Sequence, residues 1–134
     1  MNKENNLEIL PINFRHEKNF LLESNFNTWS KLRFLKDQDI SIILRKNPLC
    51  TESRLKKIRA ISIFIYELEI KPHHAYLLLH CGIGTIKAIS ILEAHDIHCR
   101  IGRLERKLNT KTIDPPNIAL IKSWIKKSKN FMDK

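Results

Sequence analysis

The chain has 134 residues, of which 43% are hydrophobic and 28% charged, and its mean hydropathy is −0.30. This composition is that of a folded globular domain and excludes a disordered chain. No run reaches the roughly 18 apolar residues of a membrane helix, and the polar start at Met1–Asn6 lacks the apolar core of a signal peptide. We therefore expect a cytoplasmic protein that does not enter a membrane.

The formal net charge is +10, and it belongs to the part of the chain that follows the first 27 residues. Residues 1–27 carry three Lys/Arg against four Asp/Glu, whereas residues 98–134 carry ten against three. This asymmetry favours a polyanionic partner, with nucleic acid ahead of an anionic surface. Heavy use of Lys, Ile and Asn by a low-G+C genome is the alternative explanation. The odd set Cys50, Cys81 and Cys99 lacks close pairs, which predicts reduced thiols.

Residues 1–27 show scattered apolar residues without a sustained period. We predict an irregular N-terminal arm that can be removed without unfolding the rest. Residues 28–134 are predicted to form a single compact all-α domain of short helices. Its first helix has Trp29, Leu32 and Leu35 at helical spacing and ends at Asp39. A second short helix begins at Ile42 and ends before Pro48.

A long helix is expected over residues 51–68, where Leu55, Ile58, Ile61, Ile65 and Leu68 mark one face. The alternating, β-branched residues 60–66 are also compatible with a buried strand. Helix is favoured because no second strand candidate is present to pair with it.

The next helix starts with Pro72 at its first position and ends at Gly82, which can adopt the left-handed conformation. Thr85 is a predicted N-cap for a helix from Ile86 to about His95. Another helix follows to Leu108, then a loop over residues 109–113. Asp114 is a predicted cap for a last helix, whose buried stripe is Ile118, Ile121, Trp124 and Ile125.

Two stretches carry a resemblance to a known motif. Gly82-Ile83-Gly84, followed by Ala88, resembles the helix-hairpin-helix of sequence-nonspecific DNA-binding modules. In a second register the hairpin is Glu69-Ile70-Lys71-Pro72, followed by Ala75, with both glycines replaced. This register resembles a bacterial family of unknown function, common in cyanobacteria and built from tandem degenerate helix-hairpin-helix units. A faint repeat between residues 35–43 and 78–86 agrees with two such units.

The resemblance and the basic charge together give the expected function, a sequence-nonspecific module that binds duplex DNA without catalysis. A glycine turn at a helix start can bind a phosphate through backbone N–H groups, and nearby cations add affinity. Glu69 places a negative charge where such a turn needs a bare amide. The predicted nucleic-acid-binding residues are Lys71, Gly82, Gly84, Thr85, Lys87, Arg103, Arg106, Lys107, Lys122, Lys126 and Lys127.

No catalytic motif, cofactor signature or small-molecule site is evident, so an enzyme is not expected. His80-Cys81 and His95-x2-His98 fit zinc spacing only loosely, and no metal is expected either. The alternative function is a protein-interaction adaptor that kept the helical scaffold after its hairpins lost their glycines. The sequence leaves the register open, as it does the choice between a nucleic-acid and a protein partner.

Overall fold

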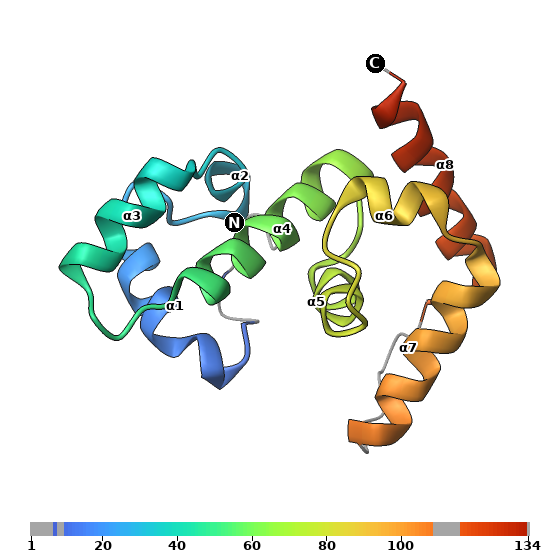
Figure 1. Cartoon of the computed structure of the whole chain (residues 1–134), viewed down its shortest axis with the longest axis horizontal. Helices are drawn as coiled ribbons and strands as arrows, with labels where there is room; N and C mark the ends of the chain where they lie inside the picture. The colour runs from blue at the N-terminus through green and yellow to red at the C-terminus, as the bar shows by residue number, and fades with distance from the viewer. Residues whose placement is uncertain (1–6, 8–9, 109–115, 134) are drawn as a thin grey trace. The chain divides into compact units, whose positions relative to one another are not determined.

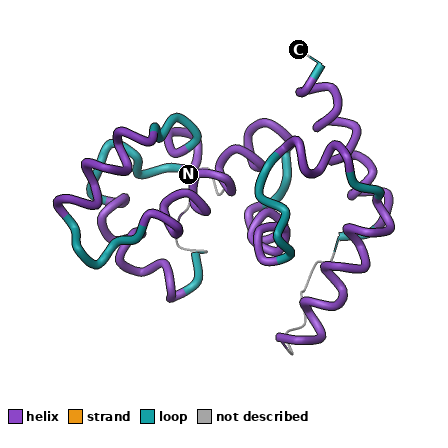
Figure 2. The backbone as a smooth tube through the Cα atoms, viewed as in Figure 1, coloured by secondary structure: helices purple, strands orange, loops and turns teal. Residues whose placement is uncertain are grey.

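The structure of the chain is a computed structural model that describes residue 7, residues 10–108 and residues 116–133. Every regular element in this part of the chain is a helix, as Figures 1 and 2 show, and the predicted all-α class is confirmed. In chain order the elements are η3 (Ile12–Phe14), α1 (Arg15–Leu22), α2 (Trp29–Leu32), α3 (Asp37–Lys46), α4 (Glu52–Leu68), α5 (Pro72–His80), α6 (Ile86–Ile91), α7 (Ala94–Leu108) and α8 (Ile118–Met132).

The chain consists of two compact units, residues 1–66 and residues 67–134. The division lies near the end of α4 and does not coincide with the predicted boundary between residues 27 and 28. Each unit has its own buried apolar residues and is described by itself. We call them unit 1 and unit 2.

The predicted irregular arm is wrong for the described residues of this segment, because they form η3 and α1 within unit 1. Leu7, Phe14 and Leu21 are each at most 2% exposed, so the segment belongs to the core. Its helical pieces are too short to show a sustained apolar period, although each of them buries an apolar side chain.

Glu17 ties this segment to α4. Its side chain is fully buried, and its Oε2 accepts a hydrogen bond of 2.8 Å from the backbone N–H of Thr51, directly before α4. The same oxygen lies 3.7 Å from a guanidinium nitrogen of Arg54. The carboxylate thereby satisfies a donor at the start of α4 from outside that helix. Removing residues 1–26 would take away this cap and four core side chains, Leu7, Leu10, Phe14 and Leu21, so we expect the truncated chain to be less stable.

The first two predicted helices are also corrected. Thr28 caps α2, but α2 ends at Leu32, and α3 already begins at Asp37. Asp39, predicted to break a helix, instead lies in the first turn of α3 and accepts a hydrogen bond of 2.9 Å from the Lys36 backbone N–H. An acidic side chain in a first turn favours helix formation there. The predicted end before Pro48 is confirmed.

The long helix predicted over residues 51–68 is confirmed as α4, so residues 60–66 are helical. In unit 2, α5 begins with Pro72 as predicted. The single helix predicted from Ile86 to His95 is wrong. Leu92 is extended, and the chain bends there between α6 and α7 (Figure 1).

Helix α8 packs against both α6 and α7, and α5 contacts α7. Ile121 and Trp124 are at most 1% exposed, whereas Ile118, predicted as part of the same buried stripe, is 38% exposed. The cap of α8 is Asn117, whose Oδ1 accepts a hydrogen bond of 2.8 Å from the Leu120 N–H. The prediction of Asp114 as the cap is therefore wrong, while the predicted loop 109–113 lies outside the described residues. Within the described ranges, no helix combines the length and apolar character needed to cross a membrane.

Candidate nucleic-acid interface

The turn between α5 and α6 has the geometry predicted for its glycine. Gly82 has a φ of +82°, in the left-handed region. The Gly82 N–H donates to the Leu79 carbonyl at 3.0 Å, and the Ile83 N–H donates to the Leu78 carbonyl at 2.9 Å. These two bonds form a Schellman motif, which satisfies the last carbonyls of α5. Thr85 then caps α6, since its Oγ1 accepts from the Ala88 N–H at 3.0 Å.

The second glycine of this turn has a different role. The φ of Gly84 is not in the left-handed region, and a Cβ built there would lie 3.5 Å from Leu79 Cδ2, an ordinary contact. That position therefore faces the protein's own side chain. A methyl group at Gly84 would not stand between the backbone and a phosphate, so Gly84→Ala cannot test phosphate approach.

The turn between α4 and α5 has a similar conformation with other residues. Glu69 has a φ of +56°, so a residue with a Cβ is held in the left-handed region. Ile70, the next residue, is 2% exposed, as Ile83 is 1% exposed after Gly82. Lys71 is the N-cap of α5 and makes no side-chain capping bond. Each turn thus places one left-handed residue before one buried isoleucine.

Helix α5 separates the two turns and divides the predicted site. The helix has nine residues, which corresponds to about 14 Å at 1.5 Å per residue. Lys71 belongs to its N-terminal end, whereas Gly82, Gly84, Thr85 and Lys87 follow its C-terminal end. The predicted residues therefore form two groups.

The C-terminal end of α5 lies near the basic helix α7. Burial raises the pKa of the Cys81 thiol, while the positive charges of Arg100 and Arg103 partly oppose this rise. Helix α7, which carries Arg103 of the predicted set, contacts α5. Cations beside the C-terminus of a helix also interact favourably with its dipole, which gives these arginines a structural role without any ligand.

The N-terminal end of α5 contains an ion pair. Lys127 Nζ of α8 lies 2.9 Å from Glu69 Oε2, and both side chains are substantially exposed. The positive charge of Lys127 is therefore partly neutralised by Glu69, which makes Lys127 a weaker candidate for a phosphate contact. The structure brings Lys127 and the Glu69–Lys71 turn together, which the sequence spacing alone did not indicate.

The other predicted cations are exposed on α6, α7 and α8. Within the described part of the chain, none of them makes an ion pair; they are Lys87, Arg103, Arg106, Lys107, Lys122 and Lys126. Unit 1 differs, because several of its cations are neutralised internally, namely Arg54 by Glu17, Lys56 by Glu52 and Arg59 by Asp37. Each unit carries 12 Lys/Arg and seven Asp/Glu, so the two units differ in how their cations are paired and not in net charge.

A groove of about 500 Å³ lies where α8 passes the bend between α6 and α7. Lys122 of the predicted set lines it, but its other lining residues were not predicted as functional. No sequence signal identified them, because their proximity depends on the bend at Leu92. The lining residues are Leu92, Glu93, Ala94, His95, Ile118, Lys122, Ile125 and Lys129.

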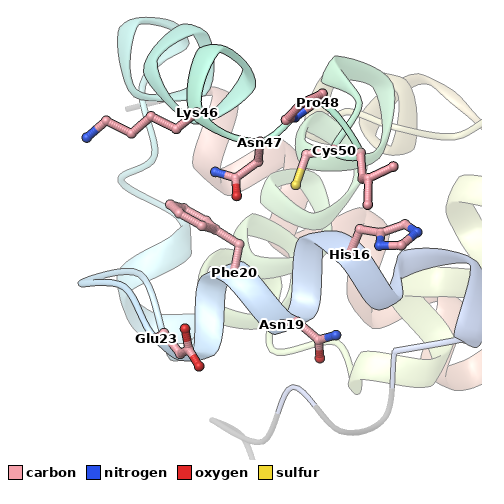
Figure 3. Close-up of a pocket in the computed structure, with 9 residues that line it drawn as sticks. His16, Asn19, Phe20, Glu23, Lys46, Asn47, Pro48 and Cys50 are labelled. Atoms are coloured by element: carbon pink, nitrogen blue, oxygen red, sulfur yellow. The ribbon is translucent and has the colours of Figure 1, made fainter.

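Unit 1 has a separate cavity of about 320 Å³ between α1 and the segment that ends α3 (Figure 3). Cys50 is 7% exposed there, and burial together with the charge of Glu17 raises the pKa of its thiol, which disfavours the nucleophilic thiolate. No predicted site residue lines this cavity. Its lining residues are His16, Asn19, Phe20, Glu23, Lys46, Asn47, Pro48, Leu49 and Cys50.

The histidines and cysteines singled out in the sequence do not converge on one point. Cys99 Sγ lies 3.5 Å from His95 Nε2 on α7. Among the residues with described positions, no three His, Cys, Asp or Glu side chains group as metal ligands.

The family model described as "Domain of unknown function (DUF4332)" matches residues 11–131. The chain belongs to the DUF4332 family. The match starts just before η3 and ends within α8, so the DUF4332 domain takes in both units and most of the segment predicted as an arm. The prediction of a family of unknown function is thereby confirmed. No curated protein and no solved structure matches this DUF4332 chain.

Proposed function

We propose that the chain is a noncatalytic module that binds duplex DNA without sequence specificity, and that its two turns are degenerate helix-hairpin-helix units. The observation that carries the proposal is the set of exposed cations on α7 and α8 that have no ion-pair partner among the described residues. Such cations can neutralise phosphates and release counterions, which is the main source of nonspecific affinity.

The Gly82 turn supports the proposal more than the Glu69 turn does. Gly82, Ile83 and Thr85 provide a left-handed residue, a buried anchor and a capped helix start, and α7, which carries Arg103, contacts α5. At the other turn the Glu69 carboxylate would repel a phosphate, and Lys127 is already engaged with it. We therefore infer that phosphates approach the α7 side of unit 2, with Arg103, Arg106 and Lys107 as the principal contacts.

The test is fluorescence anisotropy of a random-sequence duplex with the full chain across a salt series. Log K should fall linearly with log[salt], at a slope of about −0.9 for each phosphate neutralised. The triple variant Arg103→Gln, Arg106→Gln, Lys107→Gln should flatten that slope by about 2 to 3. The matched control replaces the exposed unit 1 residues Lys31, Lys36 and Lys57 with Gln and should leave the slope close to that of the original chain.

Equal flattening by both triple variants would mean that only net charge matters and that unit 2 holds no interface. An absence of binding at about 50 mM salt, where nonspecific contacts are strongest, would reject the nucleic-acid function altogether.

The second candidate function is a protein-interaction adaptor. The Glu69–Lys127 ion pair favours the adaptor function. A phosphate site needs open backbone amides at its turn, and at the Glu69 turn an internal ion pair is present instead. The two candidates differ in salt dependence, since a protein interface with an apolar centre loses much less affinity between low and physiological salt.

A further inference from the structure

The groove between α8 and the bend at Leu92 combines apolar and cationic residues in a regular order. Ile118, Lys122, Ile125 and Lys129 all line it, and their spacing of four, three and four residues puts them on one face of α8. The opposite wall consists of Leu92, Glu93, Ala94 and His95. The groove therefore has apolar residues on both walls, two lysines on the α8 side and one glutamate on the opposite side.

Part of this apolar surface is uncovered. Ile118 is 38% exposed, and Leu92 is partly exposed. The groove volume of about 500 Å³ falls within the roughly 300–1,000 Å³ of clefts that take ligands. Covering these side chains would remove apolar area from water, which is the main favourable contribution to protein association.

The pattern of charge determines which occupant fits. Duplex DNA can pair with Lys122 and Lys129, but its phosphates bring no apolar groups to cover Ile118. A second copy of this chain is disfavoured because the chain itself carries a net charge of +10. An occupant with apolar and acidic residues on the same face satisfies both parts of the lining.

We propose that this groove binds an acidic amphipathic helix of another protein. Leucine-like side chains of that helix enter between Ile118 and Leu92, and its Glu or Asp residues pair with Lys122 and Lys129. The proposal does not depend on DNA binding, since it uses an apolar surface that DNA cannot cover.

The probe is a fluorescein-labelled peptide with leucines at helical i, i+4, i+7 spacing and glutamates beside them. A peptide with the same residues in scrambled order and a second with lysines in place of the glutamates are the matched ligands. Each is titrated into the full chain with methyl-labelled Ile and Leu, and the methyl NMR spectrum is recorded. A random-sequence duplex and vesicles of anionic phospholipid are titrated in the same way.

The amphipathic acidic peptide should shift the methyl signals of Leu92, Ile118 and Ile125, and the other two peptides should not. Lys122→Glu with Lys129→Glu should weaken its binding by about tenfold or more, which is about 1.4 kcal/mol. The control Lys31→Glu with Lys57→Glu changes the net charge equally and should have little effect. Ile118→Asn should also weaken binding of the peptide, while the slope of log K against log[salt] for DNA binding should stay unchanged.

Three results would overturn the proposal. One is the absence of methyl shifts at the groove with the acidic peptide. Another is equal binding of the scrambled peptide, because attraction would then be purely electrostatic. The third is a stronger response of the same methyl groups to DNA or to vesicles, which would assign the groove to that partner. Since the mapping is made on the unaltered chain, none of these results depends on whether a variant folds.

Discussion

The two turns at the ends of α5 perform the same task with different residues. Glu69 and Gly82 both hold the left-handed conformation, and Ile70 and Ile83 are both buried directly after them. Gly82 reaches this conformation without a Cβ penalty, whereas Glu69 incurs a cost of roughly 1–2 kcal/mol. The comparison teaches that the fold requires the backbone conformation and the apolar anchor, while glycine is required only where no other contact offsets the strain.

Lys127 is the contact that distinguishes the Glu69 turn. Its ion pair with Glu69 joins α8 to the start of α5. An exposed pair of this kind contributes only about 0–1 kcal/mol, so it offsets the left-handed cost in part. The ion pair therefore reduces the strain at Glu69 without cancelling it, and it leaves a carboxylate where an anion site would need open backbone amides.

The largest expected effect comes from the feature that the turns share. Ile70→Ala and Ile83→Ala each remove a side chain that is at most 2% exposed, and each should cost about 2–5 kcal/mol of unfolding free energy. Urea denaturation followed by circular dichroism measures both. The exposed control Ile12→Ala should change the free energy by much less. If one isoleucine proves dispensable, the turns are not equivalent anchors.

The next effect separates the left-handed glycine from its neighbour. Gly82→Ala places a Cβ at a φ of +82° and should cost about 1–2 kcal/mol. Gly84→Ala meets only Leu79 Cδ2 at an ordinary 3.5 Å and should be nearly neutral. Thermal melting of the two variants tests this difference. Equal losses would show that both glycines are needed for the turn.

The third prediction concerns the caps that follow the turns. Thr85→Ala removes the hydroxyl that accepts from Ala88 N–H and should cost about 1 kcal/mol. Lys71 makes no side-chain capping bond, so Lys71→Ser introduces an acceptor at the N-cap of α5 and should stabilise by up to about 1 kcal/mol. Chemical denaturation of both variants measures the changes. If Lys71→Ser lowers the free energy of unfolding, the lysine side chain contributes more to stability than the new N-cap does.

The smallest expected effect is the difference in stability between two variants at Glu69, Glu69→Gly and Glu69→Ala. Both remove the ion pair with Lys127, but Glu69→Gly also relieves the left-handed strain, so it should be about 1 kcal/mol more stable than Glu69→Ala. Glu67, inside α4, is the matched control, and there the glycine variant should be the less stable one. Differential scanning calorimetry can compare the four variants. If the glycine variant is the less stable one at position 69 as well as at position 67, the backbone at Glu69 is not strained.

The sequence by itself determined the elements whose signals are local. The periodicity of residues 51–68 specified α4, Pro72 specified the start of α5, and Gly82 with Thr85 specified a left-handed turn and a cap. Each of these depends on neighbours a few residues apart, which a sequence displays directly. The basic character of the α7 and α8 surfaces was also visible there, since it follows from composition.

Tertiary structure decided what depends on residues distant along the chain. Glu17 showed no sequence signal of its role, because the backbone N–H that it accepts from belongs to Thr51, 34 residues later. The charge of Glu69 was visible in the sequence, but its partner Lys127 lies 58 residues away and is identified only by the structure. The groove exists only because α8 returns past the bend at Leu92. Such long-range contacts have no periodicity, so packing alone reveals which charges are neutralised and which apolar surfaces stay open.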